Sequence, residues 1–246
     1  FESPAQKARH AGAQMLLVLN ASPFHVGKGL EREVQMAQRV KESGLPLVYA
    51  HLVGGQDEVI FEGRSFTLNG QGQVVARAPA FQECLQIIEV QAEKGQLGLS
   101  IRGQQISPES TWQEDLWHAL VLGIKDYLGK NGFPGAILGL SGGIDSALVL
   151  ALAVDAIGAD KIHAVMMPSP YTADISWLDA REMAQRLNVR YDEISIAPLF
   201  EGFKASLAEQ FKGLAEDTTE ENIQARVRGT LLMAMSNKTG SIVLTT

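Results

Sequence analysis

An apolar run that breaks at a glycine-rich turn constrains the fold of this chain more than any other feature. Residues 136–154 read AILGLSGGIDSALVLALAV, which predicts a buried strand, a turn over 141–146 and a helix from about Asp145. Ligands of open α/β sheets bind at the carboxyl ends of strands. Glycines let the backbone approach a ligand closely, and the helix that follows directs free N–H groups toward it. The turn therefore predicts an anion-binding site, with phosphate as the favoured anion.

Strand-like and helix-like segments alternate around this turn. Strands are expected over 136–141, 161–169, 190–196 and 241–246, and helices over 110–132, from about 145, and over 174–188, 198–213 and 218–240. Thr111 and Glu114 have the spacing of a capping box at the start of the first helix. Short buried strands that alternate with helices predict a parallel sheet with helices on both faces, which is an α/β fold.

The first 90 residues carry a different pattern. Strands are expected over 13–20 and 45–55, and an amphipathic helix over 28–44 that Gly44 ends. Residues 58–81 predict short strands, and their Asn69-Gly70 step is a hairpin signal.

The next segment predicts a strand and then a linker. Residues 84–90 are strand-like, and Cys84 within them is expected to be a small buried hydrophobic residue rather than a nucleophile. Residues 91–110 lack sustained periodicity and are rich in Gly, Gln and Ser, which favours a linker.

Composition and charge exclude several classes of protein. A net charge of −7 over 246 residues leaves no basic footprint for nucleic acid. No apolar run reaches the roughly 18 residues of a membrane span, so no membrane partner is expected. A single cysteine excludes an internal disulfide framework and fits a reducing, cytoplasmic location. The chain starts at Phe1 and closes on the strand-like residues 240–246, so we expect an internal fragment of a longer protein.

The turn differs from the common mononucleotide-binding loop. That loop, G-x-x-x-x-G-K-[ST], places a lysine on the β and γ phosphates, and no lysine follows here. Asp145 would repel a bare phosphate, so a bridging Mg²⁺ is the natural way to keep a carboxylate there. The alternative is a glycine turn that only packs a helix on a sheet, with Asp145 favoured by the helix dipole.

Six stretches carry a resemblance to known families. SGGIDS (141–146) resembles the pyrophosphate-binding loop of the ATP pyrophosphatase superfamily, whose members cleave ATP between the α and β phosphates. MPSPYTADIS (167–176), EENIQARVRG (220–229) and SIVLTT (241–246) resemble the NAD synthetase family within that superfamily. LLVLNASPFHVGK (16–28) and GGQDEVIFEGRSF (54–66) resemble the nitrilase-like glutaminase domain of the glutamine-dependent members.

This resemblance implies a fold and a domain order. It implies the C-terminal portion of a nitrilase-like α-β-β-α sandwich, followed by a doubly wound parallel sheet of the adenine nucleotide alpha hydrolase type. The glutaminase portion would occupy 1–90, the linker 91–110, and the ATP-binding synthetase domain 111–246, truncated at its C-terminus.

The resemblance also implies an activity. ATP would adenylate deamido-NAD, and glutamine-derived ammonia would displace AMP to give NAD, with pyrophosphate released in the first step. ATP and Mg²⁺ are the implied cofactors, deamido-NAD and glutamine the implied substrates, and a homo-oligomer the implied assembly. Two alternatives stay open: another adenylating amidotransferase or thiolase with the same loop, and a non-catalytic nucleotide-binding module.

Site residues follow by resemblance at matching positions. The implied ATP contacts are Gly139, Leu140, Ser141, Gly142, Gly143, Ile144, Asp145, Ser146 and Thr246. Asp145 is the implied Mg²⁺ position, Asn222 the implied deamido-NAD contact, and Ser22 and Lys28 the implied glutamine contacts. The family's glutaminase residues (a glutamate, a lysine and a cysteine) would precede Phe1, so no catalytic residue is expected in this chain. Arg226 and Arg228 are two apart and diverge on a helix, so at most one of them should face the site.

Overall fold

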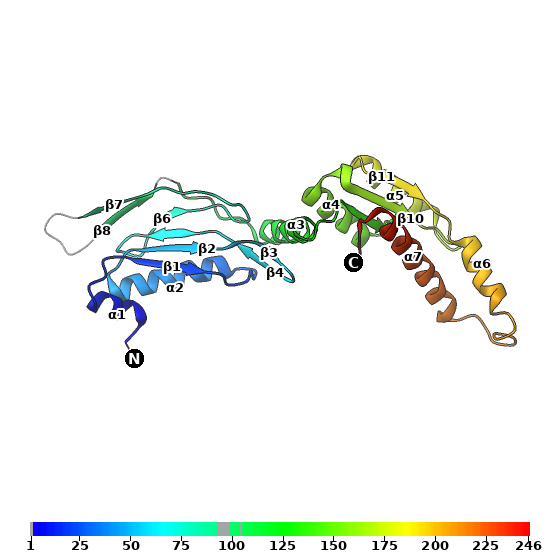
Figure 1. The fold of residues 1–246 in the computed structure, drawn as a ribbon, viewed down its shortest axis with the longest axis horizontal. Helices are drawn as coiled ribbons and strands as arrows, with labels where there is room; N and C mark the ends of the chain where they lie inside the picture. Colours follow the sequence, from blue (N-terminus) through cyan, green and yellow to red (C-terminus); the bar gives the residue numbers. More distant parts are fainter. Residues whose placement is uncertain (1, 93–98, 104) are drawn as a thin grey trace. The chain divides into compact units, whose positions relative to one another are not determined.

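The computed structural model describes residues 2–92, 99–103 and 105–246. The chain divides into two compact units, Phe1–Asp126 (unit 1) and Tyr127–Thr246 (unit 2). Each unit is built around its own four-stranded sheet (Figure 1). The domain and linker limits inferred from the sequence stay predictions.

Unit 1 contains a mixed sheet with the strand order β1-β2-β5-β6. Its elements are α1 (Pro4–His10), β1 (Leu16–Asn20), α2 (Lys28–Ser43), β2 (Leu47–His51), β3 (Val53–Gln56), β4 (Val59–Glu62), β5 (Phe66–Leu68), β6 (Val74–Arg77), β7 (Ile88–Ala92) and β8 (Leu99–Gly103). Strands β1 and β2 run parallel, whereas β2 and β5 and then β5 and β6 run antiparallel.

Helix α2 covers one face of this sheet (Figure 1) because its apolar stripe meets alternate strand residues. Val40 of α2 is buried with Leu47, Tyr49, Phe66 and Leu68 of the strands. The helix ends at Gly44 in a left-handed conformation, which confirms the predicted stop.

The predicted hairpin at Asn69-Gly70 is confirmed. Strands β5 and β6 pair on either side of it, and Asn69 Oδ1 accepts hydrogen bonds of 3.0 Å from the backbone N–H groups of Gln71 and Gln73. The side chain of Asn69 therefore holds a turn longer than the two-residue type.

Two further hairpins complete unit 1. Strand β3 pairs with β4, and β7 pairs with β8, both antiparallel. Strand β8 lies inside 91–110, so part of the segment expected as a linker is paired in a hairpin; residues 93–98 and 104 of that segment lie outside the described residues.

The expected burial of Cys84 is wrong. The residue is exposed and lies before β7, which begins at Ile88. Its neighbours Leu85 and Ile87 are also exposed, so this apolar run lies on the surface of unit 1. Apolar composition alone suggested burial, but a side chain is buried only where another element covers it.

Unit 2 contains the predicted parallel sheet, in the strand order β11-β10-β9-β12. Its elements are β9 (Ala136–Gly139), α4 (Ile144–Ile157), η1 (Ala159–Lys161), β10 (Ile162–Met166), α5 (Asp174–Arg186), β11 (Arg190–Glu193), α6 (Ala197–Ser206), α7 (Thr218–Thr239) and β12 (Ile242–Leu244). The alternation predicted from the sequence is confirmed, although α6 ends earlier than expected.

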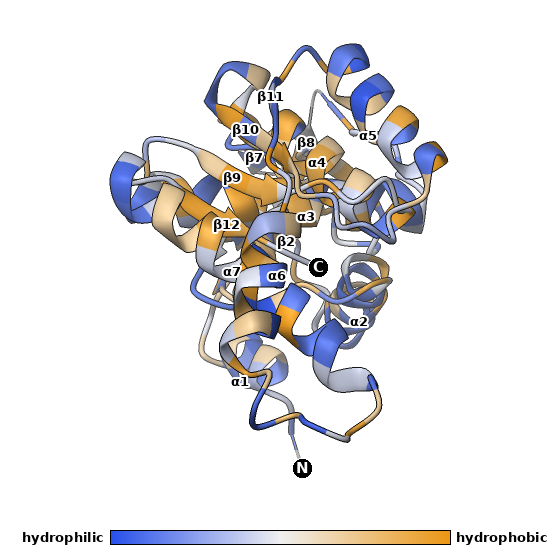
Figure 2. Ribbon diagram, turned by 90° about the vertical axis from the view of Figure 1, so that its right-hand side faces the viewer, coloured by the Kyte–Doolittle hydropathy of each residue, from blue (hydrophilic) through white to orange (hydrophobic). Residues whose placement is uncertain are grey.

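Helices cover both faces of the parallel sheet. The chain moves from β9 through β10 to β11 by way of α4 and α5, and returns by way of α7 to β12 on the other side of β9. Right-handed crossovers in opposite directions place these helices on opposite faces. Ile137 and Val165 pack on the α7 side, and their neighbours Leu138 and Ala164 are equally buried. Burial on both faces explains why β9 is apolar throughout its length (Figure 2).

Helix α3 (Trp112–Lys130) spans the limit between the two units. Thr111 and Glu114 form the predicted capping box: Glu114 Oε2 accepts from Thr111 N at 2.7 Å, and Thr111 Oγ1 accepts from Glu114 N at 3.3 Å. In the part of the chain that the structure describes, no helix is both long enough and apolar enough to cross a membrane.

The helix that follows the glycine turn allows a matched test of the core. Leu150 on α4 is fully buried, whereas Leu148 on the same helix is 48% exposed. We expect Leu150→Ala to lower the free energy of unfolding by about 2–5 kcal/mol because it leaves a cavity between helix and sheet. Leu148→Ala should change it by less than about 0.5 kcal/mol. Equilibrium denaturation of both variants decides, and equal losses would contradict this packing.

Candidate functional site

The glycine turn forms a loop that its own two serines hold in shape. Ser146 is buried, and its Oγ donates to Gly143 O at 3.0 Å, lies 3.0 Å from Ser141 Oγ and accepts from Ser141 N at 3.2 Å. Gly143 is the N-cap of α4 and makes no side-chain cap hydrogen bond. The first N–H groups of α4 thus keep their capacity to bind an anion.

Gly142 has a structural reason to be glycine. Its φ is +80°, and a Cβ at this position would lie 2.2 Å from Ser176 O in the first turn of α5. The loop therefore packs directly against the backbone of the neighbouring helix, where no side chain fits.

A cavity of about 590 Å³ opens at the carboxyl ends of β9, β10 and β12. Helices α4 and α7 form its sides. The implied ATP contacts that line it are Gly139, Leu140, Ser141, Gly143, Asp145, Ser146 and Thr246. The tertiary structure thus brings together residues that are more than 100 positions apart in the sequence.

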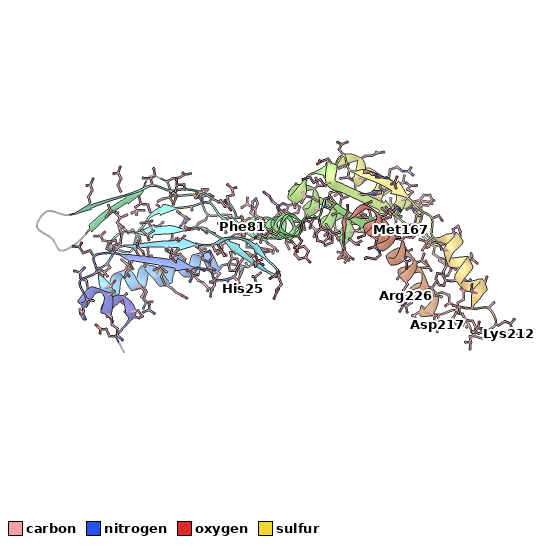
Figure 3. All side chains as sticks on the ribbon, in the orientation of Figure 1. His25, Phe81, Met167, Lys212, Asp217 and Arg226 are labelled. Carbon is pink, nitrogen blue, oxygen red and sulfur yellow. The ribbon has the colours of Figure 1, made fainter. Side chains whose placement is uncertain are left out.

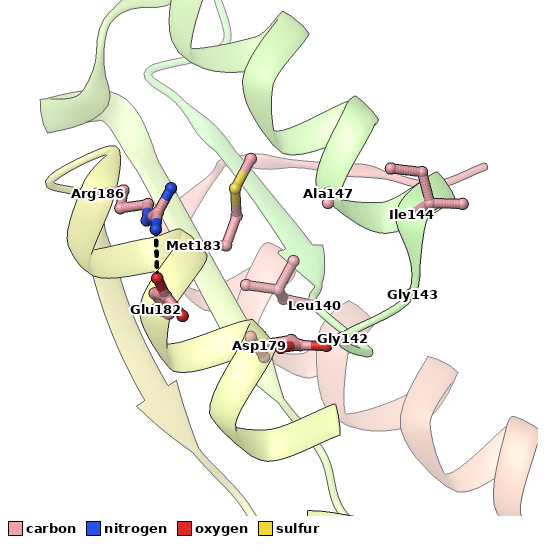
Figure 4. Close-up of a pocket in the computed structure, with 10 residues that line it drawn as sticks. Leu140, Gly142, Gly143, Ile144, Ala147, Asp179, Glu182, Met183 and Arg186 are labelled. Carbon is pink, nitrogen blue, oxygen red and sulfur yellow. Dashed lines mark hydrogen bonds and ion pairs between the residues drawn. The ribbon is translucent and has the colours of Figure 1, made fainter. Parts of the chain in front are cut away.

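Two of the implied ATP contacts face the other side of the loop. Gly142 and Ile144 line a second cavity of about 440 Å³ between the loop and α5 (Figure 4). Its far wall contains Asp179 and an ion pair of 2.5 Å between Arg186 and Glu182. The loop is therefore a thin wall between two cavities.

The structure separates the two arginines of α7. Arg228 lines the 590 Å³ cavity, and its Nε donates to Met167 O at 3.1 Å. Burial lowers the pKa of its guanidinium, which nonetheless stays charged at neutral pH. Arg226 is exposed and donates to Asn222 O at 3.0 Å. In Figure 3 its label on α7 lies between those of Asp217 and Met167. Arg228 is thus the cation at the cavity.

Asn222 lies one helical turn outside the cavity. It is exposed on α7, three residues before Ala225 and seven before Gly229, both of which line the cavity. Residues at these spacings share one helix face. Asn222 is therefore placed to meet a ligand that extends beyond the cavity.

Met167 and Thr172 also line the cavity, although the sequence did not predict them as site residues. Met167 is buried at the end of β10, and Thr172 follows it, with Oγ1 accepting from Ser169 N at 2.9 Å. Both belong to the stretch 167–176, whose position after a strand was the available signal.

In unit 1, the implied glutamine contacts lie in different surroundings. Ser22 Oγ accepts a hydrogen bond from Arg32 Nη2 at 3.0 Å. Lys28 is partly exposed in the first turn of α2, where its Nζ lies 3.2 Å from Glu31 Oε2. Sequence reasoning did not single out Arg32, because a buried arginine on an amphipathic helix carries no local signal.

The residues present fit a metal ion that arrives with phosphate. Among the described residues, groups of three or more His, Cys, Asp or Glu side chains suited to hold a metal are absent. Asp145 supplies one exposed carboxylate to the cavity. Mg²⁺ is commonly held by one or two carboxylates together with substrate phosphates, so this single carboxylate suits it.

The cavity lies at the carboxyl ends of parallel strands, beside a glycine-rich loop, a helix N-terminus and the partly buried cation Arg228. These features define an α/β domain suited to a phosphate-bearing ligand. Residues 116–246 match the family model described as NAD synthase. The chain belongs to the NAD synthase family.

Curated relatives match along nearly the whole chain. It is 47% identical over 238 residues to a glutamine-dependent NAD(+) synthetase of Rhodobacter capsulatus, covering 96% of this chain and 42% of the relative. It is 32% identical to the protein of that name from Thermotoga maritima, covering 100% of this chain and 47% of the relative. The chain thus spans less than half the length of these relatives.

A solved structure agrees with these relatives. The glutamine-dependent NAD+ synthetase of Acinetobacter baumannii in complex with ADP matches with a TM-score of 0.90 at 42% identity, covering 96% of this chain and 44% of that one.

The two glycines of the loop give a matched pair of variants. Gly142→Ala should lower the free energy of unfolding by about 1–3 kcal/mol, because alanine is strained at positive φ and its Cβ meets Ser176 O. Gly143 has φ −86°, and a Cβ there would lie no closer than 3.4 Å to another group. Gly143→Ala should therefore unfold close to the wild type. Denaturant titration compares the two; similar stabilities would contradict the close approach.

Proposed function

We propose that the full-length protein makes NAD from deamido-NAD, ATP and glutamine, as a carbon–nitrogen ligase. One observation carries the proposal: the SGGIDS loop, Arg228 and Thr246 meet at one cavity in a chain of the NAD synthase family. The names of the curated relatives support glutamine as the nitrogen donor.

The chemistry requires activation of a poor electrophile. The nicotinate carboxylate of deamido-NAD attacks the α phosphorus of ATP, the bond to the β phosphate breaks, and pyrophosphate leaves. Ammonia then attacks the activated carbonyl, AMP departs, and the ammonia loses a proton as the amide of NAD forms. The N–H groups of the loop and of the first turn of α4 bind the leaving pyrophosphate.

Charged side chains at the cavity have complementary tasks in this proposal. Arg228 is partly buried beside Met167 and offers positive charge to the phosphates. Asp145 is the carboxylate that would hold Mg²⁺, which would neutralise phosphate charge when bound. Thr246 is a further ATP contact, and Gly142 and Ile144 shape the loop from its other side.

The deamido-NAD substrate is larger than the ATP phosphates and needs contacts beyond the cavity. Asn222 is proposed as such a contact, because it is exposed on the helix face that leads into the cavity.

We propose that unit 1 belongs to a nitrilase-like glutaminase domain, with Ser22 and Lys28 as glutamine contacts. Support comes from its mixed sheet covered by α2 and from the resemblance of 16–28 and 54–66. The glutaminase, linker and synthetase limits of 1–90, 91–110 and 111–246, a homo-oligomeric assembly and a cytoplasmic location complete the proposal.

The products of ATP turnover test the proposal. With deamido-NAD, glutamine and Mg²⁺, the full-length protein should form AMP, pyrophosphate and NAD in equal amounts. Xanthosine monophosphate and aspartate are offered separately in place of deamido-NAD. ATP turnover with deamido-NAD alone would distinguish this protein from other adenylating amidotransferases. Appearance of ADP and orthophosphate would show that the loop assignment is wrong.

Asp145→Asn should impair adenylation without unfolding the protein. An amide coordinates Mg²⁺ weakly. Mutation of a residue that only hydrogen-bonds to a metal ligand already lowers metal affinity or activity by about 10–100-fold, so at least that loss in kcat/KM for ATP is expected when the ligand itself is changed. Asp179→Asn is the matched control, since Asp179 lines the cavity on the other side of the loop. Measuring NAD formation against Mg²⁺ concentration compares them. Unchanged Mg²⁺ dependence in Asp145→Asn would refute the metal role.

A further inference from the structure

Three separate segments of unit 1 meet at one buried arginine. Arg32 of α2 pairs through Nη1 with Glu62 Oε1 at the end of β4, and both side chains are more than nine-tenths buried. Its Nη2 faces Ser22 Oγ at 3.0 Å, Ser22 O at 3.2 Å and Pro23 O at 3.4 Å. One guanidinium therefore joins the two stretches that resemble the glutaminase family, 16–28 and 54–66.

We propose that Arg32, held by Glu62, is a positioning residue that fixes Ser22 and its hydroxyl for glutamine. The inference rests on the proposed function, because it takes Ser22 as a glutamine contact.

The hydrogen bonds of Ser22 leave one donor for a ligand. Its backbone N–H donates to Asn20 Oδ1 at 2.9 Å, and its carbonyl oxygen lies 3.1 Å from His51 Nε2. Its Oγ accepts from Arg32, which carries only donors. The hydroxyl hydrogen of Ser22 can then donate to a carboxylate or amide oxygen, and a charged donor behind Oγ strengthens that bond through polarisation.

Arg32 also sets the distance between the two proposed glutamine contacts. Lys28 and Arg32 are four apart on α2, so they share one helix face. Nη2 of Arg32 donates to the backbone of Ser22, and Nη1 of the same guanidinium pairs with Glu62. A bidentate fork can satisfy both partners, whereas a single ammonium drawn to Glu62 leaves Ser22 without its donor.

His51 supports the same backbone but cannot replace Arg32. Its two ring nitrogens each lie 3.1 Å from a carbonyl oxygen, of Leu52 and of Ser22. Burial, and then the nearby Arg32 charge, lower the pKa of His51 and favour the neutral ring, which donates only one proton. The contact to Ser22 Oγ comes from Arg32 alone among the described residues.

A double-mutant cycle in the full-length protein tests this role. The variants are Ser22→Ala, Arg32→Lys, the pair together, and Arg39→Lys as the control on the exposed side of α2. NAD formation is measured against glutamine and, separately, against ammonium chloride. Ser22→Ala and Arg32→Lys should each raise KM for glutamine about tenfold, the effect of one charge-assisted hydrogen bond, with ammonia-dependent kcat nearly unchanged.

Non-additivity is the decisive result. If Arg32 acts through Ser22, the double variant should match Ser22→Ala within about twofold. Effects that multiply, an Arg32→Lys loss that is equal for both nitrogen donors, or no Arg32→Lys effect would each overturn the positioning role. If Ser22→Ala leaves KM for glutamine unchanged, Ser22 is not a glutamine contact. That result would refute the proposed function of Ser22, and it differs from each result that would refute only the role of Arg32.

A second variant keeps the test valid if Arg32→Lys does not fold. Glu62→Gln retains the side-chain shape and an acceptor oxygen for Arg32, so a smaller rise in KM for glutamine is expected. This rise should also vanish in the Ser22→Ala background. Thermal unfolding identifies which variants are folded, and a Glu62→Gln effect that persists without the Ser22 hydroxyl would overturn the proposal.

Discussion

The contact between Gly142 and the backbone of α5 is the constraint on which unit 2 depends. It fixes the loop at a distance that no side chain could tolerate, and the Ser141–Ser146 hydroxyl pair then closes the loop on itself. Helix α4 consequently starts with its free N–H groups at the carboxyl end of β9. The position of the cavity, and the side on which Asp145 lies, both follow from that start.

Buried charge pairs fix the position of α2 within unit 1. Arg77 makes two bonds of 2.7 Å to Glu33 of α2 and one of 3.1 Å to Ser107 O, and Arg32 joins Glu62 to Ser22. Removing charges from water offsets much of their mutual attraction, so such pairs add little net stability. Their effect is geometric, because each fixes where α2 lies relative to specific loops.

Local patterns were reliable where they were long or chemically specific. The alternation in 111–246, the Thr111–Glu114 capping box and the Gly44 helix end all appear as expected. The pattern failed for the burial of Cys84, where a short apolar run does not reveal whether another segment covers it. Burial there depends on contacts distant in sequence.

The sequence by itself determined the strand–turn–helix order and the family resemblance, and it predicted an anion-binding loop, because these depend on periodicity, local backbone geometry and short motifs. Only the tertiary structure decided that Arg228 rather than Arg226 reaches the cavity, that Gly142 and Ile144 face away from it, and that Arg32 joins Ser22 to Glu62. Each of these depends on which face of one element meets another, which is set by packing between segments distant in sequence.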